Sequence, residues 1–195
     1  MSTHPYINQY AGQLAREVNT YLRGEGGSNE RYGVAVETIK NELNTLPPHN
    51  SQIVLAQDLY TGIPFEAIAV WFNKRIGEFI QFPNFLSSSM RDFNNAATVY
   101  RIATSSSSAG RDISKIVRKP GEAEVLFLPN TIFKITGVTE KRFVELEEVS
   151  EAPSPIVILR EVFLQDEEVN EIYEHANNII CDENDIPSLF DTGEI

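Results

Sequence analysis

Two glutamates, Glu122 and Glu124, stand at the start of a stretch that is otherwise apolar as far as Leu128. In an extended strand, residues two apart point to the same face and lie about 6–7 Å apart along the backbone. The spacing therefore predicts two carboxylates on one face of a strand that enters the core. Such a pair could solvate the exposed end of the strand, or it could act in catalysis. A glycosidase also uses two carboxylates, but these usually come from different strands, so the pair supports that class poorly.

Three consecutive serines, Ser87, Ser88 and Ser89, follow Phe-Leu at the end of another predicted strand. Upstream of them a strand ends in Leu-Tyr-Thr-Gly, and downstream the glutamates open Glu-Ala-Glu-Val-Leu-Phe-Leu-Pro. This order of motifs resembles the arginine-specific mono-ADP-ribosyltransferases, a family that includes bacterial toxins and animal enzymes. In that family Arg-Gly ends the first strand, Ser-Thr-Ser follows Phe-Leu, and Glu-x-Glu opens a later strand. The resemblance covers most of the chain. It implies that ADP-ribose moves from NAD to an arginine of another protein, with release of nicotinamide.

The resemblance also implies a role for each carboxylate. Breaking the bond between nicotinamide and ribose develops positive charge on the ribose, which a fixed carboxylate, here Glu124, would stabilise. A guanidinium is a charged, forked donor, so a second carboxylate, here Glu122, would orient the acceptor and help remove its proton. Ser87 would position Glu124 by a hydrogen bond, and Ser88 and Ser89 would support the nicotinamide pocket.

The residues expected to bind NAD depart from the family pattern at Ser88, which replaces a threonine, and more importantly at Thr61. Thr61 stands where the family has an arginine that holds phosphate and ribose oxygens of NAD, and threonine cannot supply a charged fork of donors. Loss of a charge-assisted hydrogen bond costs about 1.5–3 kcal/mol. Gly62 would let the backbone approach the nicotinamide amide, and Phe93 would stack on the nicotinamide ring. Arginines elsewhere could replace the missing charge, and the candidates are Arg75, Arg91 and Arg101.

Two other functions stay open on the sequence. A degenerate member of the family could keep the fold and bind a partner protein without catalysis, which Thr61 favours. An NAD glycohydrolase would instead give the ribosyl group to water. The intact Glu-x-Glu favours an enzyme, because a chain that had lost its activity would be expected to lose the glutamates too.

Helical periodicity dominates the first third of the chain, and short β-branched and aromatic stretches follow in quick succession. The predicted fold is α+β, with N-terminal helices packed on a two-sheet, mostly antiparallel β-sandwich. We expect one domain over residues 1–181, with a helical part (1–50), a sheet core (51–163) and a C-terminal helix (166–180). The acidic tail, 182–195, is predicted to be mobile or to depend on a partner.

Composition limits the class of partner. The net charge of −12 disfavours nucleic acid. No apolar run approaches the ~18 residues of a membrane span, and the N-terminus lacks the pattern of a signal peptide. The single cysteine, Cys181, excludes an internal disulfide and fits a reducing compartment. His4, His49 and His175 lack the spacing of metal ligands, so no metal is expected. We expect a monomer that acts on a protein substrate, in the cytoplasm or after delivery into a host cell.

Overall fold

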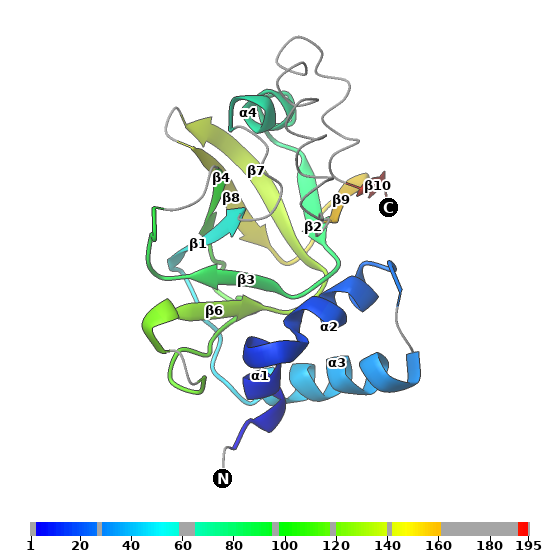
Figure 1. Ribbon diagram of the computed structural model, residues 1–195. Coiled ribbons are helices and arrows are strands. Elements are labelled where there is room, and N and C mark those ends of the chain that lie inside the picture. Colours follow the sequence, from blue (N-terminus) through cyan, green and yellow to red (C-terminus); the bar gives the residue numbers. More distant parts are fainter. Residues whose placement is uncertain are drawn as a thin grey trace.

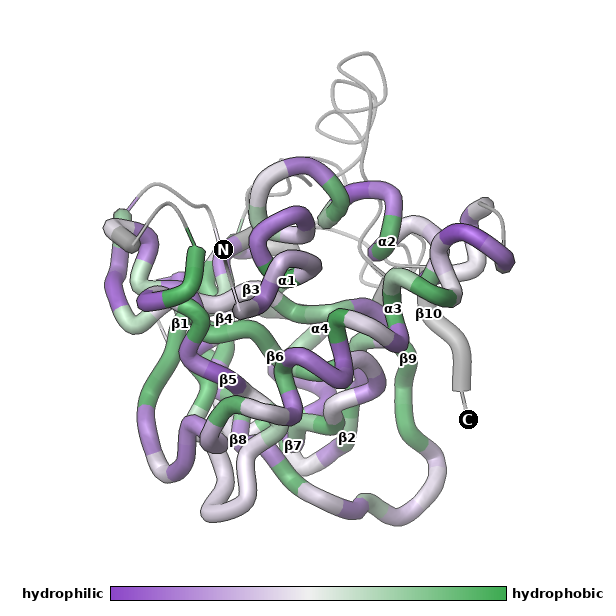
Figure 2. Tube along the Cα trace, turned by 90° about the horizontal axis from the view of Figure 1, so that it is seen from below, coloured by the Kyte–Doolittle hydropathy of each residue, from purple (hydrophilic) through white to green (hydrophobic). Residues whose placement is uncertain are grey.

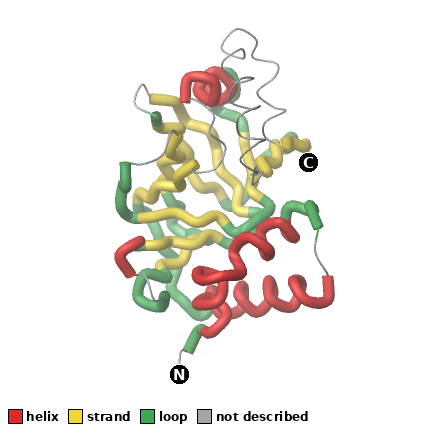
Figure 3. The backbone as a smooth tube through the Cα atoms, in the orientation of Figure 1, coloured by secondary structure: helices red, strands yellow, loops and turns green. Residues whose placement is uncertain are grey.

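The structure is a computed structural model that describes residues 3–26, 29–58, 65–94, 98–117, 120–139, 142–160 and 191–194. Within these residues, the N-terminal helices form a layer beside a sheet, and one further helix lies at the opposite end of that sheet (Figures 1 and 3). The predicted α+β class, with helices first and strands later, is confirmed.

The N-terminal helices follow the predicted periodicity. They are α1 (Pro5–Gln9), a π-helical turn η1 (Tyr10–Leu14), α2 (Ala15–Leu22) and α3 (Asn29–Asn44). Their apolar residues gather in one core, where Ile7, Val18 and Ile39 are fully buried. Glu42 on α3 accepts hydrogen bonds from the backbone N–H groups of Tyr6 at 3.2 Å and Ile7 at 2.9 Å. These bonds satisfy amides that the first turn of α1 leaves without a partner in its own helix.

Ten strands among the described residues form the sheet. In chain order they are β1 (Ile53–Asp58), β2 (Phe79–Phe82), β3 (Leu86–Ser89), β4 (Thr98–Ala103), β5 (Gly110–Asp112), β6 (Glu124–Phe127), β7 (Thr131–Thr139), β8 (Phe143–Val149), β9 (Ile156–Arg160) and β10 (Asp191–Glu194). Their order across the sheet is β10-β9-β2-β7-β8-β4-β1-β3-β6-β5. Most neighbours are antiparallel, as predicted, and the parallel pairs are β2 with β9 and β4 with β8.

The described strands join in one sheet, not in the two that were predicted. A single residue pair, Leu55 of β1 with Ser89 of β3, connects β3, β6 and β5 to the remaining strands. Figure 1 shows β3 and β6 running across the direction of β7 and β2. The sheet therefore changes direction at this link instead of dividing, and the expected two-sheet sandwich is wrong in this respect. Strand periodicity in a sequence predicts which segments are strands, but it does not identify their distant partners.

Strand β6 separates two hydrophobic cores. Val125 and Phe127 face the core that α4 (Phe65–Asn73) covers, and Leu126 points the other way, into the core of the N-terminal helices. All three side chains are fully buried. In Figure 2 hydrophobic stretches follow the strands, whereas loops are mostly hydrophilic. Burial on both faces explains why the sequence of β6 is a continuous apolar run, and it leaves Glu124, the first residue of the strand, at the edge of the interior.

Other differences from the predictions are local. Ile76 would continue the apolar spacing of α4, but it lies beyond the end of that helix and is 51% exposed. Strand β5 follows a serine-rich segment and pairs with β6. Strand β10 lies within the predicted acidic tail and pairs with β9. The predicted helix over 166–180 and Cys181 lie outside the described residues.

Candidate active site

Glu122 and Glu124 do not belong to one continuous strand. Pro120–Glu122 forms a 3₁₀ turn, and β6 begins only at Glu124. Between them Ala123 has a φ of 48°, in the left-handed region that residues other than glycine rarely adopt. The prediction that both carboxylates lie on one face of a strand is therefore wrong, because the alternation of faces is broken at Ala123. Glu122 lies on the surface, whereas Glu124 is only 8% exposed.

Ser87 on β3 holds the carboxylate of Glu124. Its Oγ donates a hydrogen bond to Oε1 of Glu124 at 2.6 Å. In the ladder between β3 and β6, Ser87 stands opposite Leu126, so Glu124 is its diagonal neighbour on the same face. The hydrogen bond expected between these two side chains is thus present, and its role in catalysis stays a prediction.

Burial raises the pKa of Glu124 above the ordinary value of a glutamate. The hydrogen bond from Ser87 lowers this pKa, and the negative charge of Glu122 raises it. Burial is the largest of the three influences because removal from water penalises the charged form. Once ionised, a carboxylate that is screened by little water attracts a neighbouring cation more strongly than an exposed one does. Glu124 is therefore suited to stabilise positive charge that forms beside it.

The other two serines use their hydroxyl groups within the protein. Ser88 Oγ donates to the carbonyl oxygen of Val125 at 2.7 Å, and Ser89 Oγ donates to the carbonyl oxygen of Glu122 at 2.7 Å. Both serines are buried. They fasten β6 and the turn before it to β3, and a contact of either serine with nicotinamide stays a prediction.

Phe93 follows β3 and is 43% exposed, so its ring is open to a molecule arriving from solvent. Thr61 and Gly62 lie outside the described residues. The roles of Phe93, Thr61 and Gly62 in NAD binding stay predictions.

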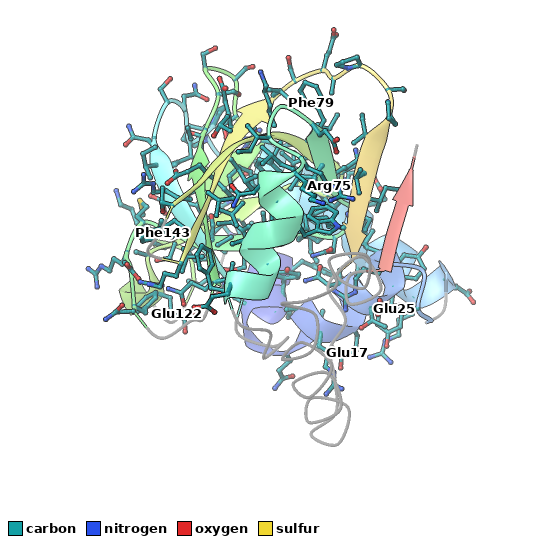
Figure 4. The ribbon with its side chains drawn as sticks, turned by 90° about the horizontal axis from the view of Figure 1, so that it is seen from above. Glu17, Glu25, Arg75, Phe79, Glu122 and Phe143 are labelled. Carbon is teal, nitrogen blue, oxygen red and sulfur yellow. The ribbon has the colours of Figure 1, made fainter. Side chains whose placement is uncertain are left out.

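The three arginines considered as replacements for the missing family arginine lie in different places. Arg75 lies across α4 from Glu122 when the molecule is seen from above (Figure 4). Arg101 pairs with Glu145 at 2.7 Å. Arg91 contacts the turn that carries Glu122, where its Nη1 donates to a backbone carbonyl at 3.2 Å. Arg91 is therefore the one of the three that the structure brings to the two glutamates.

Asn19 on α2 supports β3, the strand that carries the three serines, and it is not among the residues predicted to form the site. Its Oδ1 accepts a hydrogen bond from the backbone N–H of Phe85 at 3.2 Å, and its Nδ2 donates to Oη of Tyr10 at 2.9 Å. Asn19 is only 8% exposed. Its two hydrogen bonds link the helices to Phe85, the residue that precedes β3. The feature of the sequence that could have indicated this role is a polar residue on the buried face of a predicted helix.

The described part of the chain contains neither a candidate metal site nor a membrane-spanning helix. No group of three or more His, Cys, Asp or Glu residues there could hold a metal ion. His4 forms side-chain hydrogen bonds with Thr3 and Thr45, and His175 lies outside that part. None of the described helices combines the length and apolar character that crossing a membrane requires.

Comparison with known protein families identifies the family of the chain. The profile described as NAD:arginine ADP-ribosyltransferase matches residues 2–154. The chain belongs to this family. The reaction in the family name moves ADP-ribose from NAD to arginine, so NAD is a substrate of this ADP-ribosyltransferase. No curated protein sequence matches the chain significantly.

Solved structures share the fold, and two of them, Plx2a and Vis, are described as ADP-ribosyltransferases. Plx2a, a toxin from Paenibacillus larvae, is 21% identical with a TM-score of 0.64, over 75% of this chain and 85% of that chain. Vis from Vibrio splendidus, solved in complex with agmatine, is 19% identical with a TM-score of 0.56, over 78% of each chain. C3stau2 from S. aureus, solved with NAD, is 15% identical with a TM-score of 0.62, over 76% of this chain and 86% of that chain.

Ser87→Ala should move the acid limb of the pH–rate profile of this ADP-ribosyltransferase to higher pH. The substitution removes the hydrogen bond that lowers the pKa of Glu124, so ionising the carboxylate would require a higher pH. We also expect nicotinamide release at neutral pH to fall about tenfold, because the carboxylate loses its positioning contact. Nicotinamide release should be measured from acidic to neutral pH, with the exposed Ser106→Ala as control. An unchanged acid limb in Ser87→Ala would contradict this role.

Proposed function

We propose that this chain transfers ADP-ribose from NAD to an arginine side chain of a protein, using Glu124 and Glu122 as its catalytic pair. Glu124 acts on the ribose of NAD, and Glu122 acts on the acceptor guanidinium. The observation that carries the proposal is the contrast between the two carboxylates. One is buried and held by a serine at 2.6 Å, and the other lies on the surface two residues earlier.

The first step is cleavage of the bond between nicotinamide and C1′ of the ribose. The electron pair of that bond leaves with nicotinamide, which departs as a neutral molecule, and the ribose gains oxocarbenium character. Glu124 stabilises the developing positive charge because its carboxylate is fixed before the reaction and is screened by little water. The raised pKa of Glu124 means that this step requires a higher pH than an ordinary glutamate would.

The second step is attack of the acceptor on C1′ from a surface that a protein substrate can reach. A guanidinium nitrogen forms the new bond to C1′, and the proton that it loses goes to a base. Glu122 is suited to both parts of this step, because an exposed carboxylate can bind the guanidinium fork and accept its proton. The two carboxylates lie near each other in the chain because the reaction brings two cationic groups together, the ribosyl cation and the acceptor guanidinium.

The alternative functions make less use of this geometry. An NAD glycohydrolase needs a group that stabilises the ribosyl cation, but it has no need of a second carboxylate aimed at a guanidinium. A non-catalytic binding module gains nothing from burying a carboxylate, because burial of a charge is costly. The chain retains both features, which supports transfer to arginine.

The partner that we propose is a protein rather than a nucleic acid, since a net charge of −12 disfavours contact with a polyanion. We propose a monomer as the active form. Resemblance to structures described as toxins supports action on a host protein after delivery into a host cell, and the cytoplasm is the alternative site of action.

Incubation with labelled NAD and a mixed protein lysate tests the proposed function. We expect label to be transferred to protein, and mass spectrometry should locate ADP-ribose on arginine side chains. Glu124→Gln serves as the control for non-enzymatic attachment. Label on residues other than arginine, or nicotinamide release without labelled protein, would contradict the proposal.

Thr61→Arg should tighten NAD binding by about 10- to 100-fold, which is the size expected for a regained charge-assisted hydrogen bond. Calorimetric titration in the Glu124→Gln background measures affinity while NAD is not consumed. Thr61→Gln is the matched control, because it adds length and donors without charge, and it should gain little. Equal affinity of the Thr61→Arg and Thr61→Gln proteins would show that charge at this position does not limit NAD binding.

A further inference from the structure

The end of β3 and the segment that follows it donate hydrogen bonds to three consecutive carbonyl groups of the glutamate turn, residues 121–123. Arg91 Nη1 donates to the carbonyl oxygen of Gly121 at 3.2 Å. Ser89 Oγ donates to that of Glu122 at 2.7 Å, and the backbone N–H of Met90 donates to that of Ala123 at 3.0 Å. These three bonds fix the backbone of Glu122 and of the residues on either side of it.

Arg91 is joined to the same set of contacts through its own backbone. Its N–H donates to Ser89 Oγ at 3.0 Å, so one serine hydroxyl connects Arg91 with the carbonyl of Glu122. Ser89 belongs to the serine motif. Arg91 was considered above as a possible replacement for the family arginine that holds NAD, but the proposed mechanism assigns it no step, and the described contact of its side chain is with the backbone of this turn.

The far end of the segment is anchored to another part of the sheet. Nη2 of Arg142, which precedes β8, contacts both carboxylate oxygens of Asp92 at 2.7 and 2.6 Å. The same Nη2 donates to Oδ1 of Asn94 at 3.1 Å. The pKa of Asp92 is lowered, chiefly by its hydrogen bond with Arg142. Arg91 thus extends toward the glutamate turn from a segment that is held on both sides.

The turn needs such support because of its conformation. Ala123 has a φ of 48°, and a non-glycine residue in this region persists only where its surroundings hold it. The two glutamates depend on the turn to different degrees. Glu124 is already held by the β3–β6 ladder and by Ser87, whereas Glu122 is the last residue of the 3₁₀ turn itself.

We propose that Arg91 is a positioning residue that fixes the turn of Glu122, and that it thereby favours transfer to a guanidinium over hydrolysis of NAD. This inference rests on the proposed function, because it assumes that Glu122 acts on the acceptor. Arg91 acts through the backbone of the turn and touches neither reactant. Its loss should therefore reduce transfer while leaving hydrolysis, which depends on Glu124.

Arg91→Ala in the full chain tests this role, with agmatine, a small guanidine, as the acceptor. ADP-ribosylagmatine and free ADP-ribose are measured in the same reaction. We expect kcat/KM for agmatine to fall about 3- to 10-fold, as for loss of one partly exposed hydrogen bond, and both hydrolysis and KM for NAD to stay nearly unchanged. Arg91→Lys should restore most of the transfer, because a lysine ammonium can donate to the same carbonyl. The exposed Arg16→Ala on α2 is the matched control.

Arg142→Met is a second, independent variant. It removes the anchor of the segment but keeps Arg91, and it should shift the ratio of transfer to hydrolysis in the same direction as Arg91→Ala. If Arg91→Ala instead raises KM for NAD and reduces transfer and hydrolysis equally, Arg91 contacts NAD and the proposal is overturned. An unchanged ratio in Arg91→Ala overturns it as well.

Hydrogen–deuterium exchange gives a measurement that does not depend on the acceptor. In Arg91→Ala the amides of residues 121–124 should exchange faster than in Arg16→Ala, and unchanged exchange would overturn the proposal. If the wild-type chain modifies neither agmatine nor protein arginine, the proposed function fails, and the exchange measurement alone then decides whether Arg91 holds the turn.

Discussion

Glu124→Gln should reduce both transfer and NAD hydrolysis by about 100- to 1,000-fold, the loss typical for removal of a preorganised electrostatic group. The substitution keeps the shape of the side chain, and Ser87 can still donate to the amide oxygen. It removes only the negative charge that would stabilise the ribosyl cation. Nicotinamide release measures the effect in the presence and absence of an acceptor, and an unchanged thermal unfolding midpoint would show that the fold is intact. Wild-type rates of nicotinamide release in this variant would refute the role of Glu124.

Glu122→Gln should separate the two activities. Transfer to an arginine acceptor is expected to fall about 100-fold, because the variant loses both the charge that binds the guanidinium and the base that accepts its proton. Hydrolysis should persist, since Glu124 and Ser87 are untouched. The measurement compares ADP-ribosylated acceptor with free ADP-ribose in one reaction, and Glu147→Gln, an exposed glutamate on β8, is the control. Equal loss of both products would show that the proposed division of labour is wrong.

The same variant has a consequence for pH dependence. The negative charge of Glu122 raises the pKa of Glu124, so Glu122→Gln should lower that pKa and let Glu124 ionise at a lower pH. The acid limb of residual hydrolysis should therefore move to lower pH in Glu122→Gln, opposite to the shift expected for Ser87→Ala. A shift in the same direction for both variants would contradict the electrostatic account of Glu124.

The order of motifs in the sequence was sufficient to predict the family. The resemblance carried by Glu-x-Glu and by three serines after Phe-Leu implied a contact between Ser87 and Glu124, which is present at 2.6 Å. The helices of the first third and the succession of short strands after them were also predicted correctly, because local patterns of apolar residues determine them.

The geometry of the site could not be predicted in the same way. An even spacing of two glutamates predicts a shared strand face only if the residue between them is extended, and Ala123 has a φ of 48°. The contacts that hold this conformation come from Ser89, Met90 and Arg91. They are distant in the chain, and no local pattern reveals them. The single link between β1 and β3, which joins the strands into one sheet, is a distant contact of the same kind.

The most direct test of the central claim is a product balance for wild-type protein incubated with NAD and agmatine. Nicotinamide, ADP-ribosylagmatine and free ADP-ribose are measured together over time. We expect ADP-ribosylagmatine to match most of the nicotinamide released at saturating agmatine. Glu122→Gln should convert the product to free ADP-ribose, and Glu124→Gln should form almost none of the three compounds. Nicotinamide release matched entirely by free ADP-ribose in the wild-type protein would identify a glycohydrolase and contradict the claim that this site modifies arginine.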